Sequence, residues 1–451
     1  MKKFFYTLLL LLTTSVIWAQ TEDTTESEGE YVKTGYTIGG VPALAYDSDL
    51  GFKYGAVVNL YDYGDGSRYP NYDQSLYLEW SNTTKGSMIA QIVYDTRSLI
   101  PGVQMIAEAG YFPEQALDFY GFNGYESTYN ASYVDDTNEA AYISRLFYRH
   151  QRKLLRLKAD FQGQTKNKNI RWLAGVAFYN TKVEPLDLAK LNKGKDEADL
   201  LPDVPTLYDS YVDWNIIDES QAGGGNSMFV KTGIIYDTRD NEASPNKGMW
   251  SEAILLSAPK FLANKDGGYA RLMLTHRQYF TLAPERLTLA YRLSWQSKIA
   301  GTTPFYMLPY FFDSKQTQNG LGGAKNLRGV LRNRVVGDGV ALGNVELRYK
   351  FWKTKLLKQD FYIALSGFMD AGMVTKRYEI NTDGVTDAYG YTGDFIRNEW
   401  FNKQDEGLHI GYGAGLHFAL NNNFIVAVDY GMAAKKEDGS SGLYIGLNYI
   451  F

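Results

Sequence analysis

The sequence predicts an all-β fold, a transmembrane antiparallel β-barrel of about 16 strands. Apolar and polar residues alternate at period two, in segments of about ten residues, throughout residues 31–451. A secretory leader precedes this region. No later apolar run approaches the ~20 residues that a membrane helix needs, so only a closed barrel would satisfy the backbone within lipid.

The chain is expected to divide into a leader, a linker and one barrel domain. Residues 1–19 begin with two lysines after Met1 and continue in an apolar run from Phe4 to Leu12, as in a signal peptide. Residues 20–30 are polar and acidic and are expected to form a short periplasmic linker. We expect residues 31–451 to form the barrel, in the outer membrane of a Gram-negative bacterium.

Composition excludes several kinds of site. The chain has no cysteine, which excludes disulfides, thiolate metal ligands and cysteine nucleophiles. Its four histidines (His150, His276, His409 and His417) are too scattered in sequence to indicate a metal site by spacing. The formal net charge of -5 gives no reason to expect nucleic acid. We therefore expect no metal, no cofactor and no nucleic-acid partner.

The last segment of the chain shows the alternation best. One face carries only apolar and aromatic residues: Leu443, Ile445, Leu447, Tyr449 and Phe451. Four preceding segments alternate in the same way, and their polar faces carry charges, which suits a wet lumen better than the core of a soluble sandwich. The positions assigned to the lumen include Glu346, Arg348, Asp370, His417 and Asp429.

Connection lengths support the strand count. In outer-membrane barrels short periplasmic turns alternate with longer external loops. If Ala140 to Phe161 form one long strand, all the long connections fall on the external side. These connections run from Phe112 to Glu139, Val183 to Gly225, Gly301 to Gly339 and Lys376 to Glu406.

Three local patterns occur in the second half of the chain. They are Leu327-Arg328-Gly329-Val330 ahead of Gly343-Asn344-Val345-Glu346, then Gly367-Phe368-Met369-Asp370-Ala371-Gly372, and Tyr236-Asp237-Thr238-Arg239-Asp240 ahead of Pro245 and Gly248. Together they resemble the BamA/TamA superfamily of outer-membrane assembly factors, the bacterial surface antigen barrels. The first pattern looks like the sixth external loop and the strand after it, the second like the next strand, and the third like a periplasmic turn.

The resemblance implies that the sixth external loop folds inward, where Arg328 and Gly329 would meet Asp370. Glu346 supplies a second carboxylate on the same inner face. A buried guanidinium is tolerated when carboxylates hold it through paired hydrogen bonds. Such a loop lock could be a static brace or part of a switch, and the sequence leaves both open.

Two further features concern the chain's ends. Tyr449-Ile450-Phe451 resembles the C-terminal assembly signal shared by many outer-membrane barrels. Gly39, Gly40 and Pro42 weaken the first strand, because proline removes a hydrogen-bond donor and glycine lowers strand preference. In the superfamily the seam between first and last strands is thought to open sideways and admit client strands. A proline at a frayed strand end is the alternative.

One departure from the family affects the expected function. BamA and TamA carry periplasmic POTRA modules, whereas only about a dozen residues separate the leader from the first strand here, which indicates a short member without them. The resemblance implies insertion, assembly or translocation of proteins at the outer membrane, with partner subunits. The alternative is a passive pore or structural barrel. We expect no enzyme, because His150 is the only candidate for a hydrolase and no spacing supports it.

The expected partners are outer-membrane lipid and lipopolysaccharide, client outer-membrane proteins, and periplasmic or lipoprotein subunits. Lipopolysaccharide is suggested by a cationic run, for which lipid phosphates would be counter-ions. The run comprises Arg145, Arg149, His150, Arg152, Lys153, Arg156 and Lys158. The alternative is a solvated strand that rises past the lipid.

Overall fold

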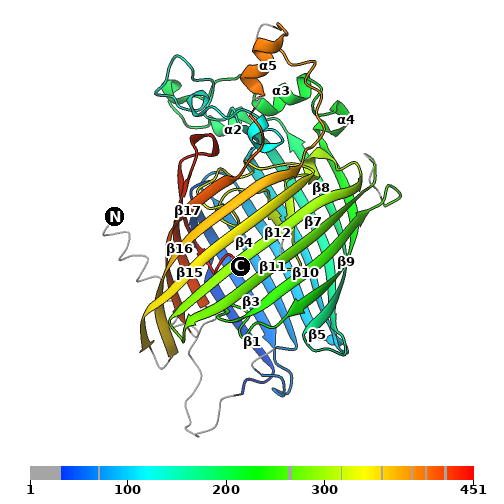
Figure 1. Cartoon of the computed structure of the whole chain (residues 1–451), viewed down its shortest axis with the longest axis vertical. Coiled ribbons are helices and arrows are strands. Elements are labelled where there is room, and N and C mark those ends of the chain that lie inside the picture. The colour runs from blue at the N-terminus through cyan, green and yellow to red at the C-terminus, as the bar shows by residue number, and fades with distance from the viewer. Residues whose placement is uncertain are drawn as a thin grey trace.

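The computed structural model describes residues 32–451 except 70–71, 263–266, 316, 357–358, 388–389, 402–403 and 421–423. The expected leader and linker lie outside the described residues. The described chain forms a closed antiparallel β-barrel, with tilted strands that follow one another in sequence order around the wall (Figure 1). The all-β fold class is thereby confirmed.

The wall strands pair antiparallel with their neighbours in sequence. They are β1 (Tyr36–Pro42), β2 (Ala45–Asp47), β3 (Gly51–Asp62), β4 (Gln74–Thr83), β5 (Met88–Ile100), β6 (Val103–Asp118), β7 (Arg149–Gln164), β8 (Ile170–Glu184), β9 (Gly224–Asp237), β10 (Gly248–Ala258), β11 (Tyr269–Ala283), β12 (Leu287–Gly301), β15 (Gly339–Leu356), β16 (Gln359–Lys376), β17 (His409–Leu420), β18 (Phe424–Ala433) and β19 (Ser441–Leu447). Because β1 and β2 are consecutive pieces that both pair with β3, the wall has 16 strands, as the sequence predicts.

Long connections gather at one end of the barrel, which we call the loop end, and short connections at the other, the turn end. The four long connections at the loop end are 119–148, 185–223, 302–338 and 377–408. Figure 1 shows the helices beyond this end: α2 (Leu188–Leu191), α3 (Leu207–Asp213), α4 (Glu219–Ala222) and α5 (Asp394–Trp400). None of the helices in the described chain is long and apolar enough to cross a membrane.

The long connections pack against one another through aromatic side chains. The ring of Tyr211 lies 5.8 Å from those of Phe122 and Phe401 and 5.9 Å from that of Trp214. Phe305, in the connection 302–338, belongs to the same buried cluster. Offset and edge-to-face aromatic pairs add stabilisation beyond the area that they bury. The loops therefore form one cohesive layer over the loop end.

The prediction that Ala140 to Phe161 form one strand is wrong for the first nine residues of that range. Residues 140–148 are turns and irregular structure, and β7 begins only at Arg149, whereas β6 continues to Asp118. The start of β7 is set by pairing with β6, where Arg149 lies opposite Asp118. Tertiary pairing, which one strand's sequence does not contain, decides where a strand begins.

The predicted faces of the C-terminal strands are confirmed for β15 to β18. Outward residues such as Val345 and Leu365 are 43% and 50% exposed, whereas the inward Glu346 and Ser366 are each 1% exposed. In a membrane barrel lipid surrounds the outer face, so apolar side chains there would lose nothing by exposure. The inward charges are buried and paired at this level, so the lumen is packed where the sequence suggested that it is wet.

The last residues differ from the prediction. Tyr449 and Phe451 were assigned to the lipid face, but β19 ends at Leu447 and Asn448 has a φ of 64°. Tyr449 then packs on an inward cluster that includes Tyr362. Left-handed φ is tolerated by asparagine and redirects the chain, so the period-two pattern ends at that residue.

Candidate functional site

The connection 302–338 between β12 and β15 contacts strands around the wall. It contains the short helix η4 (Phe305–Met307) and the hairpin of β13 (Tyr310–Phe312) and β14 (Thr317–Asn319). Arg152 of β7 donates a hydrogen bond to the Tyr310 hydroxyl at 3.2 Å, and Arg271 of β11 donates to the Met307 carbonyl at 3.3 Å. Residues of β15, β16, β18 and β19 bind its distal part, so the segment touches different sides of the closed wall.

Arg328 is the centre of the contacts made by that distal part. Its Nε and backbone N–H both donate to Asp370 Oδ2, at 2.8 and 3.1 Å, and its Nη2 donates to Asp370 Oδ1 at 3.1 Å. Neither side chain has exposed surface. A guanidinium that grips both carboxylate oxygens fixes the orientation of the loop as well as its charge.

Two more carboxylates share the Arg328 guanidinium. Nη1 donates to Glu346 Oε2 at 3.2 Å and to Asp429 Oδ2 at 3.0 Å. Each has a second partner: Arg348 Nε donates to Glu346 Oε1 at 2.8 Å, and His417 Nε2 lies 2.9 Å from Asp429 Oδ1. The network therefore alternates guanidiniums with carboxylates, which is what allows so many ionic groups to remain buried.

The aromatic ring of Phe368 covers the guanidinium. The Arg328 Cζ atom lies 3.4 Å from the centre of that ring. Because the stacking face of a guanidinium is weakly hydrated, a ring can cover it while the edge keeps its hydrogen bonds. Phe368 thus excludes water from the network.

Glycines bring the loop backbone against the wall. Gly329 has a φ of 94°, and a Cβ atom there would lie 2.6 Å from the Met432 backbone. A Cβ on Gly411 of β17 would lie 2.0 Å from the Arg328 carbonyl oxygen. The Gly329 N–H donates to the Tyr444 hydroxyl at 3.1 Å. Only residues without a Cβ permit this approach.

The structure brings Arg328, Gly329, Glu346 and Asp370 into one cluster. Sequence reasoning missed four members of it: Arg348, Asp429, His417 and Phe368. The signal for three of them was present, because Arg348, Asp429 and His417 all lie on the predicted polar faces of their strands. Nothing in the sequence showed that these strands contact the loop, since closure of the barrel sets that distance.

The cationic run lies elsewhere. Arg145 precedes β7 and lies beside Asp136, and His150 contacts the rings of Phe119 and Tyr208, whereas the other five residues lie on β7 and are engaged with carboxylates. Arg152 contacts Glu114, Lys158 contacts Glu108 at 2.9 Å, and Arg149 contacts Asp118 at 3.0 Å. Lys153 and Arg156 are also paired, with acids of β8 and β6. These cations are neutralised by neighbouring strands, which differs from both predicted roles, counter-ions for lipopolysaccharide and a simply solvated strand.

The seam between first and last strands is short. Its closing ladder consists of two residue pairs, Tyr46 with Ile445 and Asp47 with Tyr444. Beside this ladder the Ser48 N–H donates to the Leu443 carbonyl at 3.1 Å, and the Leu443 N–H donates to Ser48 Oγ at 2.8 Å. Over the described part of the chain, β1 pairs with β3 alone, so the edge that contains Gly39, Gly40 and Pro42 has no strand beside it.

The turn that follows β2 carries a pH-sensitive group beside the seam. Burial, with the nearby charges of Asp47 and Asp118, raises the pKa of Asp49 to about 7. A carboxyl whose pKa is raised by folding favours the folded state less as pH rises from its unfolded value near 4 to about 7. We therefore expect stability to fall across that range, and Asp49→Asn to remove this part of the dependence.

The measurement is the urea midpoint of wild type and Asp49→Asn at pH 4.5, 6 and 7.5. The two midpoints should separate progressively with pH, with the variant the more stable at pH 7.5. A constant difference between them would show that Asp49 does not titrate in this window.

Comparisons with known proteins agree with the barrel fold. A family model described as the Omp85 superfamily domain matches residues 111–451. The chain belongs to the Omp85 superfamily. Among solved structures, this Omp85 barrel is similar to BamA from Haemophilus ducreyi lacking POTRA domains 1–3, at 14% identity and a TM-score of 0.52, over 92% of this chain and 71% of that one.

A second solved structure with this fold is CdiB from Escherichia coli. It is 8% identical, with a TM-score of 0.52, over 96% of this chain and 69% of that chain. No curated protein sequence matches this Omp85 barrel. Membership of the superfamily identifies the protein as a β-barrel of the Gram-negative outer membrane, so its loop end is the external one.

Proposed function

We propose that this Omp85 barrel inserts, assembles or translocates other proteins at the outer membrane, with partner subunits and without catalysing a reaction. The observation that carries the proposal is the seam. A barrel wall normally pairs every strand along both edges, because unpaired backbone groups in lipid cost several kcal/mol each. Here the wall closes through two residue pairs, and the seven residues of β1 keep one edge open.

The open edge of β1 has the properties of a template for strand addition. Its side chains are largely exposed, with Tyr36 at 86% and Ile38 at 70%. An unpaired row of N–H and C=O groups binds an extended segment through main-chain hydrogen bonds, largely independently of sequence. This would let one edge serve many client barrels.

The loop lock supports this function over that of a passive pore. Arg328 and Gly329 hold the connection 302–338 against four strands of the wall with Asp370 and Glu346, and the segment is almost wholly buried. We propose that the lock keeps the barrel sealed and its last strands in register while the seam works. A wide, permanently open channel would have to displace this segment.

The terminal residues have a proposed role before folding. We propose that Tyr449 and Phe451 serve as the assembly signal in the unfolded chain. In the folded barrel the ring of Tyr449 lies 3.8 Å from Arg348 Cζ, and Arg348 also donates to the Phe451 carbonyl at 3.2 Å. In the folded barrel these contacts with Arg348 engage both terminal residues. Tyr449 and Phe451 are therefore accessible to a recognition factor only before the barrel folds.

Cross-linking the seam tests the proposal. Because the chain has no cysteine, Tyr46→Cys with Ile445→Cys places one thiol pair across the closing ladder, between outward side chains. We expect the oxidised variant in vesicles to fold urea-denatured outer-membrane barrels from the same bacterium at least about ten-fold more slowly than wild type, with recovery on reduction. Protease resistance of the client gives the rate.

The matched control is Phe418→Cys with Val426→Cys. These residues are register partners on the outward side of β17 and β18, which are paired along their length. Oxidation there should leave the rate unchanged. Equal rates for the oxidised and reduced seam variant would refute a role for the seam.

Partners follow from the same proposal. We propose that clients are outer-membrane proteins and that periplasmic or lipoprotein subunits deliver them. Outer-membrane lipid surrounds the wall. We also propose that lipopolysaccharide contacts the external loops. The cationic run on β7 does not support this contact, because its residues are paired with carboxylates of the protein.

A further inference from the structure

Three polar side chains form a chain of hydrogen bonds on the outward face of β10, β11 and β12. Ser251 Oγ lies 2.8 Å from His276 Nδ1, and the Tyr291 hydroxyl lies 3.3 Å from His276 Nε2. Ser251 is the register partner of His276. The same face carries Leu274 and Leu293, which are 42% and 56% exposed. This polar chain therefore borders the hydrocarbon of the membrane.

Counting protons shows that the polar chain is one acceptor short. If Ser251 donates to Nδ1, the Nε2–H donates to Tyr291, and the Tyr291 O–H is left over. If Tyr291 donates to Nε2, the Nδ1–H donates to Ser251, and the Ser251 O–H is left over. Within the part of the chain that the structure describes, neither hydroxyl has a second partner. In either tautomer one hydroxyl donor is therefore left without an acceptor among the described residues.

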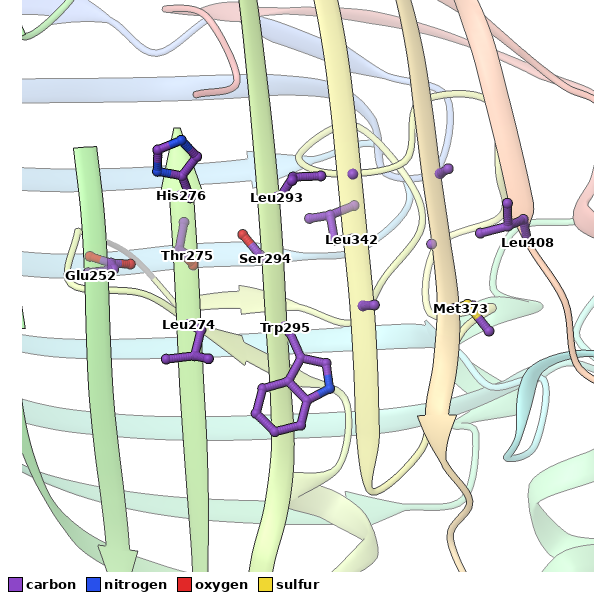
Figure 2. A pocket seen from close by; sticks show the side chains of 14 residues that line it. Glu252, Leu274, Thr275, His276, Leu293, Ser294, Trp295, Leu342, Met373 and Leu408 are labelled. Atoms are coloured by element: carbon purple, nitrogen blue, oxygen red, sulfur yellow. The ribbon is translucent and has the colours of Figure 1, made fainter. Parts of the chain in front are cut away.

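A shallow groove on the wall begins at His276 (Figure 2). In Figure 2, Trp295 and Met373 stand on β12 and β16, the two strands that flank β15. The groove is lined mainly by apolar and small residues: Leu274, Leu293, Trp295, Ala341, Gly343, Ala371 and Met373. Among the described residues, the only atom within 4 Å of a Cβ built on Gly343 would be Leu293 Cδ2, at 3.5 Å, so the space above β15 is open.

The depth of the polar chain identifies the acceptor. Tyr291 lies four residues from the start of β12 at Leu287, towards the turn end, and its ring is 6.2 Å from that of Phe280 on the neighbouring strand. Outward aromatic rings mark the membrane interface in such barrels. At the periplasmic interface phospholipid offers ester carbonyls as acceptors, and its acyl chains extend towards the bilayer centre, as the groove does.

We propose that this face is a phospholipid site, in which an ester carbonyl accepts the spare hydroxyl proton of the Ser251–His276–Tyr291 chain and an acyl chain fills the groove. The site is independent of the seam and of the proposed function. A donor without an acceptor is costly in hydrocarbon, whereas a lipid carbonyl at this depth satisfies it without displacing any protein contact. The groove supplies contact area and the polar chain supplies selectivity for ester over ether linkages.

The test compares two phospholipids with the same head group and chain length, one with ester and one with ether linkages, because the ether form has no carbonyl. Native mass spectrometry of the purified barrel, titrated with each lipid, gives the two affinities. We expect the ester lipid to bind about five-fold more tightly, as for one neutral hydrogen bond. The triple variant Ser251→Ala, His276→Leu, Tyr291→Phe removes every donor and should lower that ratio to about one.

Two further variants complete the experiment. Gly343→Leu should fill the groove and weaken both lipids equally, whereas Thr232→Val, an outward polar residue on β9, should change neither. Heat-dependent migration on gels checks that each variant is folded. Equal binding of ester and ether lipids to wild type, or an unchanged ratio in the triple variant, would overturn the proposal. Stronger retention of lipid A than of phospholipid would overturn it in favour of the external leaflet.

Discussion

Replacing Arg328 by alanine is expected to lower the free energy of unfolding by about 3–5 kcal/mol, the usual cost of breaking a buried ion pair from one side. Among the described residues Asp370 would lose the one guanidinium that it binds and keep two amide donors, the backbone N–H of residue 328 at 3.1 Å and Asn344 Nδ2 at 2.8 Å. Glu346 would keep one cationic partner, Arg348, and Asp429 would keep its hydrogen bond with His417. Urea unfolding in lipid vesicles, followed by tryptophan fluorescence, measures the change.

Two companion variants identify the origin of that loss. Arg328→Lys keeps the charge but not the fork that grips both oxygens of Asp370, so we expect a smaller but clear loss. Removing both partners, in Arg328→Ala with Asp370→Ala, should be less damaging than Arg328→Ala alone, because no unpaired carboxylate remains. Additive losses would contradict direct coupling of the pair.

A surface pair provides the control for Arg328. Arg145 lies in an external loop with 47% of its side chain exposed, 3.7 Å from Asp136. Arg145→Ala should change stability by less than about 0.5 kcal/mol, since water replaces such contacts. If Arg328→Ala were equally mild, the buried network would not hold the loop.

Gly329→Ala is expected to cost at least about 2 kcal/mol, from left-handed strain together with the displacement of the loop. The added Cβ would lie 2.6 Å from the backbone of Met432, which belongs to a paired strand and cannot move aside easily. Limited proteolysis should then cut the connection 302–338, which wild type protects by burial. The same urea titration gives the free energy.

Gly102→Ala separates the two contributions to this loss. Gly102 lies in the turn between β5 and β6 with a φ of 75°, and nothing approaches within 4 Å of a Cβ built there. Its substitution should therefore cost only the backbone strain, about 1 kcal/mol. Equal losses at Gly102 and Gly329 would show that the contact with β18 is unimportant.

Much of the site was predictable because it depends on alternation and charge. Asp370 and Glu346 were assigned to the lumen by the period of their strands, and Arg328 was matched to them by opposite charge and by family resemblance. The period of their strands also puts Asp429 and His417 on the lumen face, but it does not predict that they lie beside Arg328. Their distance from Arg328 depends on the register of β17 and β18, over a separation of about a hundred residues from the loop.

Other features depend on the surroundings of a residue. The sequence of the cationic run on β7 does not indicate whether its side chains face lipid phosphate, water or carboxylates. Only the register with β6 shows that Glu108 and Glu114 neutralise cations of this run. The position of His276 in the sequence indicates no metal site by spacing and no partner. Its hydrogen bonds to Ser251 and Tyr291 require three strands to be aligned.

The sequence by itself determined the class of fold and the face of most strands, because lipid on one side and a polar interior on the other impose a two-residue period wherever a strand crosses the membrane. The tertiary structure decided where that period stops. Asn448 takes a left-handed φ and turns Tyr449 into the barrel, and over the described residues the closing ladder has two residue pairs. Both outcomes depend on the fit between the first and last strands, which lie at opposite ends of the chain and meet only when the barrel closes.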